Sequence, residues 1–297
     1  MRLRNPGRIG DGLWLLGSPE SCVYLVKGSQ SSALISAGLS YILPDLLFQL
    51  SLAEISEKQI DSIIILHAHF DHIGIVPFLK RQWPHVNLYA SSRGWQILSN
   101  PKAISVNNDF TRQVCCRMRG GEEVLAGWDW SWRDDVSGIS LQQGSCLDLG
   151  DRQIQVIETP GHSSCSISVY IPQIQALFPS DAAAIPYRDE YLVAAGSSFA
   201  DYFRSLDKLS MLDVKMICAD HFGVITGEEA QQYVSQSKSA AQQMTDHLRL
   251  ALQTEGSPKR AAKRMVKLHF EQRPDYFITP EILLYTYERM MKQFASE

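Results

Sequence analysis

Residues 67–72, His-Ala-His-Phe-Asp-His, place four metal-capable side chains within six positions. They follow the apolar run 63–66, which predicts a buried strand, so the motif should occupy the loop at that strand's carboxyl end. In an extended loop, residues two apart point the same way, which lets His67 and His69 grip one ion. Asp71 and His72 then project toward a neighbouring position. Imidazole and carboxylate together suit a first-row divalent ion such as Zn, Fe or Mn.

Further ligand-type residues follow other predicted strands downstream. The alternating segment 153–157 runs into a Pro-Gly turn that places His162 at its exit. An apolar segment precedes Asp181, and another precedes His221. Five of the eight histidines therefore stand at strand exits, together with two aspartates. This ordered set predicts a metal site built from several loops.

With these motifs the chain resembles the metallo-β-lactamase-fold hydrolase superfamily, whose pattern is H-x-H-x-D-H followed by His, Asp and His. The resemblance covers roughly residues 10–225. It implies an α+β fold, the αββα sandwich, and two divalent metal ions. By this resemblance one ion is held by His67, His69 and His162, the second by Asp71, His72 and His221, and Asp181 bridges both. The chain departs from the family at Ser36, Ser180 and Asp220, none of which removes a ligand.

The composition changes after residue 228 and predicts two parts. Residues 1–228 form the expected αββα domain, and residues 229–297 form a helical carboxyl-terminal extension that the resemblance places over the cleft. Its predicted helices span 229–254, 259–268 and 280–294. One helix carries a basic face that could meet coenzyme A phosphates or an acidic partner, or simply be solvated. That face comprises Lys259, Arg260, Lys263, Arg264 and Lys267.

Trp128, Trp130 and Trp132 recur at a period of two, which would put their rings on one side of an extended segment. They could form the wall of an aromatic or acyl pocket, or they could pack the insertion 101–145 onto the domain.

Composition limits the partners. A net charge of −4 argues against nucleic-acid binding. The amino terminus lacks a signal-peptide core, and no apolar run is long enough to cross a membrane. Six scattered cysteines without a C-x-x-C pair are typical of reduced thiols, so a cytoplasmic location is expected. The oligomeric state is not set by the sequence.

The expected chemistry is hydrolysis by a hydroxide held between two metal ions, because metal binding lowers the pKa of water to about 7. No Gly-x-Ser-x-Gly nucleophile motif is present. Asp71 is the predicted catalytic residue, since it could orient the hydroxide or carry a proton in addition to binding metal. Asp181 stands where zinc β-lactamases commonly carry Cys, which argues against antibiotic hydrolysis.

Within the superfamily, the chain is similar to the quinolone-signal response protein family, which are thioesterases for 2-aminobenzoylacetyl-coenzyme A. The likeness includes residues 71–79, the lead into Gly161-His162-Ser163, and the tail segment 275–278. It implies that Tyr276 and Phe277 line the substrate pocket, although both also suit core packing. We therefore expect a thioesterase for an acyl- or aroylacetyl-coenzyme A in secondary metabolism or signal biosynthesis. The alternatives are a phosphodiesterase, a lactonase, or a regulatory protein with a protein partner and a vestigial site.

Overall fold

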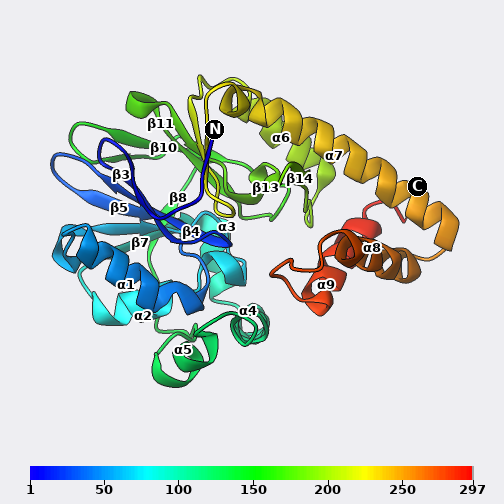
Figure 1. Cartoon of the computed structure of the whole chain (residues 1–297), viewed down its shortest axis with the longest axis horizontal. Helices are drawn as coiled ribbons and strands as arrows, with labels where there is room; N and C mark the ends of the chain where they lie inside the picture. Colours follow the sequence, from blue (N-terminus) through cyan, green and yellow to red (C-terminus); the bar gives the residue numbers. More distant parts are fainter. Residues whose placement is uncertain (296–297) are drawn as a thin grey trace.

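The computed structural model describes residues 1–295 and contains two seven-stranded sheets with helices on their outer faces (Figure 1). Helices α1 (Leu43–Leu52) and α2 (Val76–Gln82) cover the first sheet, and α6 (Phe199–Leu209) and α7 (Glu228–Glu255) cover the second. This helix–sheet–sheet–helix order is the αββα sandwich. The predicted fold class is confirmed.

The first sheet has the strand order β2-β3-β4-β5-β6-β7-β8. Neighbours from β2 to β5 pair antiparallel, and those from β5 to β8 pair in parallel. Strand β4 is apolar on both faces, because Val23 and Leu25 pack under the helices while Tyr24 and Val26 face the second sheet. The strands are β2 (Gly7–Gly10), β3 (Leu13–Ser18), β4 (Ser21–Lys27), β5 (Ser32–Ile35), β6 (Ser62–Ile64), β7 (Asn87–Ser91) and β8 (Ile139–Leu141).

The second sheet has the order β1-β16-β15-β12-β11-β10-β9, in which only β12 and β15 pair in parallel. Apolar side chains of both sheets fill the space between them, and the rings of Tyr24 and Phe178 meet edge to face at 5.3 Å. The strands are β1 (Arg2–Leu3), β9 (Cys146–Asp148), β10 (Gln153–Glu158), β11 (Ile167–Ile171), β12 (Ala176–Phe178), β15 (Met216–Cys218) and β16 (Val224–Thr226), with the hairpin β13 (Ile185–Tyr187) and β14 (Glu190–Leu192) beside them.

Three helices fill the connection between β7 and β8: α3 (Ser92–Leu98), α4 (Pro101–Cys115) and α5 (Gly121–Gly127). The side chain of Asn100 caps α4 by accepting from the backbone N–H groups of the first turn. In the described part of the chain, five short 3-10 helices occupy other connections: η1 (Ser40–Ile42), η2 (Glu57–Gln59), η3 (Phe70–His72), η4 (Pro172–Ile174) and η5 (Ser180–Ala182).

The carboxyl-terminal helices α7, α8 (Pro258–Gln272) and α9 (Pro280–Lys292) reach beyond the sandwich, and α8 and α9 turn back toward α4 (Figure 1). Helix α7 begins at the predicted boundary, but its buried stripe shares one core with the second sheet. The division into a domain and an extension therefore stays a prediction. Within residues 1–295, no helix combines the length and the apolar character needed to cross a membrane.

Candidate metal centre

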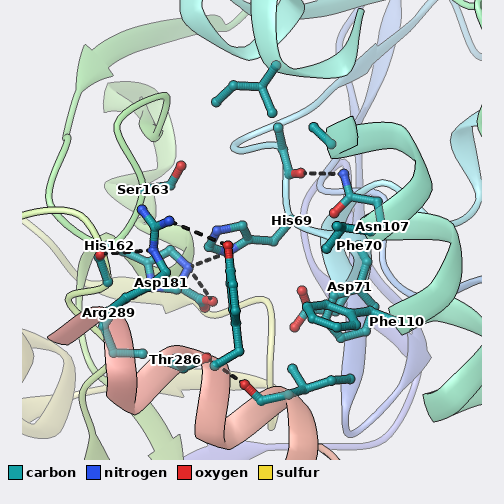
Figure 2. A pocket seen from close by; sticks show the side chains of 18 of the residues that line it. His69, Phe70, Asp71, Asn107, Phe110, His162, Ser163, Asp181, Thr286 and Arg289 are labelled. Carbon is teal, nitrogen blue, oxygen red and sulfur yellow. Dashed lines mark hydrogen bonds and ion pairs between the residues drawn. The ribbon is translucent and has the colours of Figure 1, made fainter. Parts of the chain in front are cut away.

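Four connections bring the seven predicted ligands together. His67 to His72 follow β6 and end in η3, while His162 lies between β10 and β11. Asp181 lies in η5 after β12, and His221 lies between β15 and β16. Figure 2 shows ligand candidates from three of these connections around one pocket. Each side chain stands at a strand end, where the backbone leaves the sheet and a polar group can face a cleft.

The first cluster comprises His67, His69 and His162. The Nε2 atom of His162 lies 3.2 Å from Nε2 of His67 and 2.9 Å from Nδ1 of His69. One nitrogen of each ring lies within 4.8 Å of the others. These three imidazoles could hold one metal ion.

The second cluster comprises Asp71, His72 and His221. The Nε2 atoms of the two imidazoles are 3.2 Å apart, and a carboxylate oxygen of Asp71 lies 3.7 Å from each. Asp181 lies between the clusters, with one oxygen 3.2 Å from Nε2 of His72 and 3.4 Å from Nε2 of His162. Its carboxylate therefore reaches both groups.

Backbone carbonyls orient two of the rings from outside the clusters. Nδ1 of His162 donates to the carbonyl of Ala194 at 2.5 Å, and Nδ1 of His221 donates to the carbonyl of Glu20 at 2.6 Å. A carbonyl oxygen can only accept, so each Nδ1 carries a proton. In the neutral ring, Nε2 then presents a lone pair toward the cluster.

A buried side-chain network orients two more rings. Nδ1 of His72 donates to Oδ2 of Asp220 at 2.8 Å, and the Ser180 hydroxyl donates to the same oxygen at 2.5 Å. Because the Ser180 proton is used in this way, its oxygen accepts from Nδ1 of His67 at 3.2 Å. The Nε2 atoms of His67 and His72 therefore also present lone pairs.

Four nitrogens that present lone pairs when their rings are neutral thus converge with two carboxylates, and Nδ1 of His69 lies 2.9 Å from one of them, Nε2 of His162. Such an arrangement favours a cation at its centre, either a proton on His72 or a metal ion, because buried acceptors without donors lose their hydration uncompensated. The donor set therefore fits divalent ions that take nitrogen and oxygen ligands.

The pKa shifts follow from burial and from the two carboxylates. Burial, reinforced by the neighbouring imidazoles, holds the pKa values of His67 and His69 well below the usual range. Burial also lowers the pKa of His72, but the charges of Asp181 and Asp71 outweigh it, and the net pKa is raised well above the usual value. A metal ion would replace the proton of His72 as the partner of these carboxylates.

Sequence reasoning missed the roles of Ser180 and Asp220, which hold His67 and His72. The one sequence signal for these roles was Asp220, a carboxylate directly before the predicted ligand His221. Ser180 has φ of 49°, in the left-handed region that glycine adopts freely, which explains why the resembling family usually has Gly there. Ser36 has φ of 65°, and its buried hydroxyl has no hydrogen-bond partner in the described chain.

A cavity of about 540 Å³ opens beside the clusters. Residues of α3 and α4 form one wall and residues of α9 form the other, with the candidate ligands between them. Tyr276 and Phe277 line this cavity, and the ring of Phe277 lies 5.2 Å from that of His221. Both side chains are also buried. They belong to the cavity wall and to the core at once.

The three tryptophans do not line this cavity. Trp130 and Trp132 are buried, and their indole N–H groups donate to the carbonyls of Leu125 and Leu98. Trp128 packs against Phe78. The packing interpretation is therefore correct and the pocket-wall interpretation is wrong.

The basic face of α8 also lies away from the cavity beside the candidate metal ligands. Two of its members pair with neighbouring acids, Arg264 with Glu255 at 3.2 Å and Lys267 with Glu271 at 3.8 Å. None of the five basic residues lines the cavity. The structure favours a solvated face.

The model of the metallo-beta-lactamase superfamily matches residues 19–221, more than half of the chain. The chain belongs to the metallo-β-lactamase superfamily. This membership confirms the predicted superfamily and the prediction of a metal-dependent hydrolase, and it implies divalent metal ions, typically zinc. The likeness to the quinolone-signal response protein family stays a prediction.

Two relatives and one solved structure show how far the likeness extends. The human "Acyl-coenzyme A thioesterase MBLAC2" is 25% identical over 77% of this chain and 86% of its own. A metallo-beta-lactamase fold-containing protein, ST1585 of Sulfurisphaera tokodaii, is 24% identical over 74% of this chain and 80% of its own. The superfamily protein TTHA1429 of Thermus thermophilus superposes with a TM-score of 0.69 at 18% identity, covering 97% of this chain and 94% of its own. That superposition covers nearly the whole chain, so the shared fold extends into the helical tail.

Proposed function

We propose that this metallo-β-lactamase superfamily member is a binuclear thioesterase that cleaves an acyl- or aroylacetyl-coenzyme A thioester. The convergence of four imidazole lone pairs and two carboxylates carries the proposal. His67, His69 and His162 would hold one ion, Asp71, His72 and His221 the other, and Asp181 both. Two bound ions would supply a nucleophile from water at neutral pH and polarise the scissile carbonyl.

Asp71 would act as the catalytic residue of this chain. It lines the cavity, and its carboxylate lies 3.7 Å from His72 and from His221. It is 8% exposed, so one face remains open to the cavity. A carboxylate in this position can accept the proton released from water and later pass it to the departing sulfur.

The remaining cavity wall suits an apolar acyl or aryl group. Val106 and Phe110 of α4 line the cavity together with Ile282 and Leu283 of α9, and the ring of Phe277 lies 5.2 Å from that of His221. An apolar group would leave water on entering such a pocket, which favours binding by roughly 25 cal/mol for each Å² buried. Tyr276 and Phe277 would therefore contact substrate.

The choice of a thioester among the possible substrates is supported by the relatives. The human relative is named as an acyl-coenzyme A thioesterase. A fungal relative, 22% identical over 71% of this chain, is named as an atrochrysone carboxyl ACP thioesterase. A cytoplasmic location and a role in secondary metabolism or signal biosynthesis stay predictions of the sequence.

The test measures metal content and hydrolysis on one purified sample. The substrates are an aroylacetyl thioester, a simple acyl-coenzyme A, a bis-aryl phosphodiester and a lactone. We expect about two metal ions per chain and a thioester preference. Asp71→Asn should lower kcat by about 100-fold or more, since it removes a proton acceptor at the reacting centre.

A preference for the phosphodiester or the lactone would replace the thioesterase assignment while keeping the binuclear site. Two bound ions without turnover of any substrate would indicate the regulatory alternative. Absence of bound metal after loading would contradict the site itself.

A further inference from the structure

Arg289 of α9 lies beside the candidate ligands but takes no part in either cluster. Figure 2 shows its side chain projecting from α9 toward His162 and His69. It lines the cavity, and its Nε atom donates to the carbonyl of Gly196 at 3.2 Å. Gly196 belongs to the same connection as Ala194, which orients His162. The guanidinium is thus held next to the candidate metal ligands, where the thioester carbonyl of a bound substrate would lie.

Tyr285, one helical turn earlier, completes a pair with Arg289. Its hydroxyl accepts from Nη1 of Arg289 at 3.4 Å, and the guanidinium lies over its ring at 5.8 Å. The ring also meets Phe110 of α4 at 5.8 Å, across the cavity. Tyr285 keeps 47% of its surface exposed, and its O–H remains available as a donor.

Arg289 has no carboxylate partner in residues 1–295, whereas Arg188, Arg273 and many other arginines form ion pairs. Two of the five N–H donors of a guanidinium are used by Gly196 and Tyr285. The acids that line the cavity are Asp71 and Asp181, and both carboxylates would bind the metal ions. Because Arg93 and Lys102 line the cavity as well, it presents a net positive charge and unused donors toward a ligand.

We propose that Arg289 and Tyr285 form a subsite for a second oxygen function on the acyl group, a 3-oxo or carboxylate oxygen close to the thioester carbonyl. The inference rests on the proposed thioesterase function and names its substrate class. A guanidinium fork and a phenol O–H match an oxygen acceptor of this kind. Phosphates of the carrier fit less well, because they lie many bonds from the sulfur while Arg289 lies beside the metal ligands.

The experiment compares three coenzyme A thioesters of similar length: butanoyl, 3-oxobutanoyl and succinyl. For each, kcat/KM is measured on metal-loaded wild type, Arg289→Gln, Arg289→Lys and Tyr285→Phe. The control variant is Arg119→Gln, an exposed arginine outside the cavity. We expect wild type to prefer either the 3-oxobutanoyl or the succinyl thioester over the butanoyl thioester. The preferred one identifies whether the subsite binds a 3-oxo or a carboxylate oxygen. Arg289→Gln should reduce that preference by about 10- to 100-fold, as expected for loss of a hydrogen bond to a charged group.

A second readout does not depend on turnover. Calorimetry measures binding of acetoacetate, succinate and butanoate to the same metal-loaded proteins. We expect Arg289→Gln to weaken the preferred acid relative to butanoate while the metal content stays at the wild-type level.

The possible results separate the two proposals. If Arg289→Gln lowers kcat/KM equally for all three thioesters, the residue positions the 194–196 connection and the subsite is refuted. If its effect disappears when pantetheine replaces coenzyme A, the carrier phosphates are the ligand and the subsite is likewise refuted. If no thioester is turned over but the acid preference depends on Arg289, the subsite stands and the thioesterase assignment fails.

Discussion

Asp220 joins the two halves of the metal-type centre through one carboxylate. Its Oδ2 atom accepts from His72 at 2.8 Å and from Ser180 at 2.5 Å, and Ser180 in turn accepts from His67 at 3.2 Å. One buried acceptor thus orients a candidate ligand of each ion. Outer partners of this kind fix ring orientation and increase ligand basicity, so Asp220 should influence metal affinity without binding metal.

Asp220→Asn should weaken metal binding by about 10- to 100-fold, because a neutral amide accepts less strongly from two donors. Competition with a chromophoric chelator measures the affinity of both sites. The matched control is Asp134→Asn, since Asp134 is exposed and belongs neither to the clusters nor to the cavity wall. Unchanged affinity in Asp220→Asn would show that the ring orientations do not depend on this carboxylate.

The same residues show how much of the site was predictable. The seven candidate ligands could be named because they lie in short motifs after predicted strands and match the pattern of the resembling family, and both signals are local in sequence. The hydrogen bonds that orient the ligands could not be predicted, since Asp220 is 148 residues from His72 in sequence and Ser180 is 113 residues from His67. Only the packing of the two sheets brings these pairs together.

At the scale of elements, α8 presents a buried histidine to the segment that precedes α9. The His269 ring meets that of Tyr276 at 4.8 Å, and its Nε2 atom has no hydrogen-bond partner in the described part of the chain. Burial, with a smaller contribution from Arg273, lowers the pKa of His269 to about 4. The unfolded chain restores the usual value near 6.5. Between these values the unfolded state binds more protons, so stability falls as pH falls from 6.5 toward 4.

His269→Leu should remove this sensitivity. We expect the difference in unfolding free energy between pH 7.5 and pH 5 to be smaller than in wild type by about 1–2 kcal/mol. Urea denaturation at the two pH values measures it. His247→Leu, at an exposed position of α7, serves as the control. An identical pH dependence in His269→Leu and wild type would mean that this ring titrates normally in the folded protein.

The helical tail was predictable element by element, whereas the insertion was not. Local signals set the tail: Thr279 caps α9 by accepting from the N–H of Ile282 at 3.3 Å, and Pro280 begins the helix. In the insertion, Trp132 is fixed by Asn108, whose side chain accepts its backbone N–H, and by the carbonyl of Leu98. These partners, distant in sequence, determine that the tryptophans pack in the core and do not line the pocket. The spacing of the tryptophans at every second residue cannot reveal them.

At the scale of the whole molecule, the cavity exists because two distant segments meet over the metal-type clusters. Arg117, just after α4, donates to the carbonyl of Ile278 at 3.3 Å, and Thr279 donates to Gln113 at 3.3 Å. Phe110 and Tyr285 add the ring contact between the walls. Helix α9 and the segment before it therefore form part of the cavity wall, a contact that no local sequence pattern could locate.

Metal ions should stabilise this assembly, because the clusters bring together carboxylates and imidazole nitrogens that are separated in the unfolded chain and so cannot bind an ion together there. An ion that binds only the folded state adds about 4 kcal/mol at a free concentration 1,000 times its Kd. Removal with a chelator should lower Tm by several degrees, and added Zn²⁺ or Mn²⁺ should restore it. Differential scanning calorimetry measures both steps.

Asp181→Asn should show a smaller metal-dependent shift in Tm, since that carboxylate reaches both clusters. The exposed control His85→Gln should keep the full shift. If metal content falls to zero while Tm stays constant, the converging side chains are stable without a cation, and the argument from their lone pairs fails.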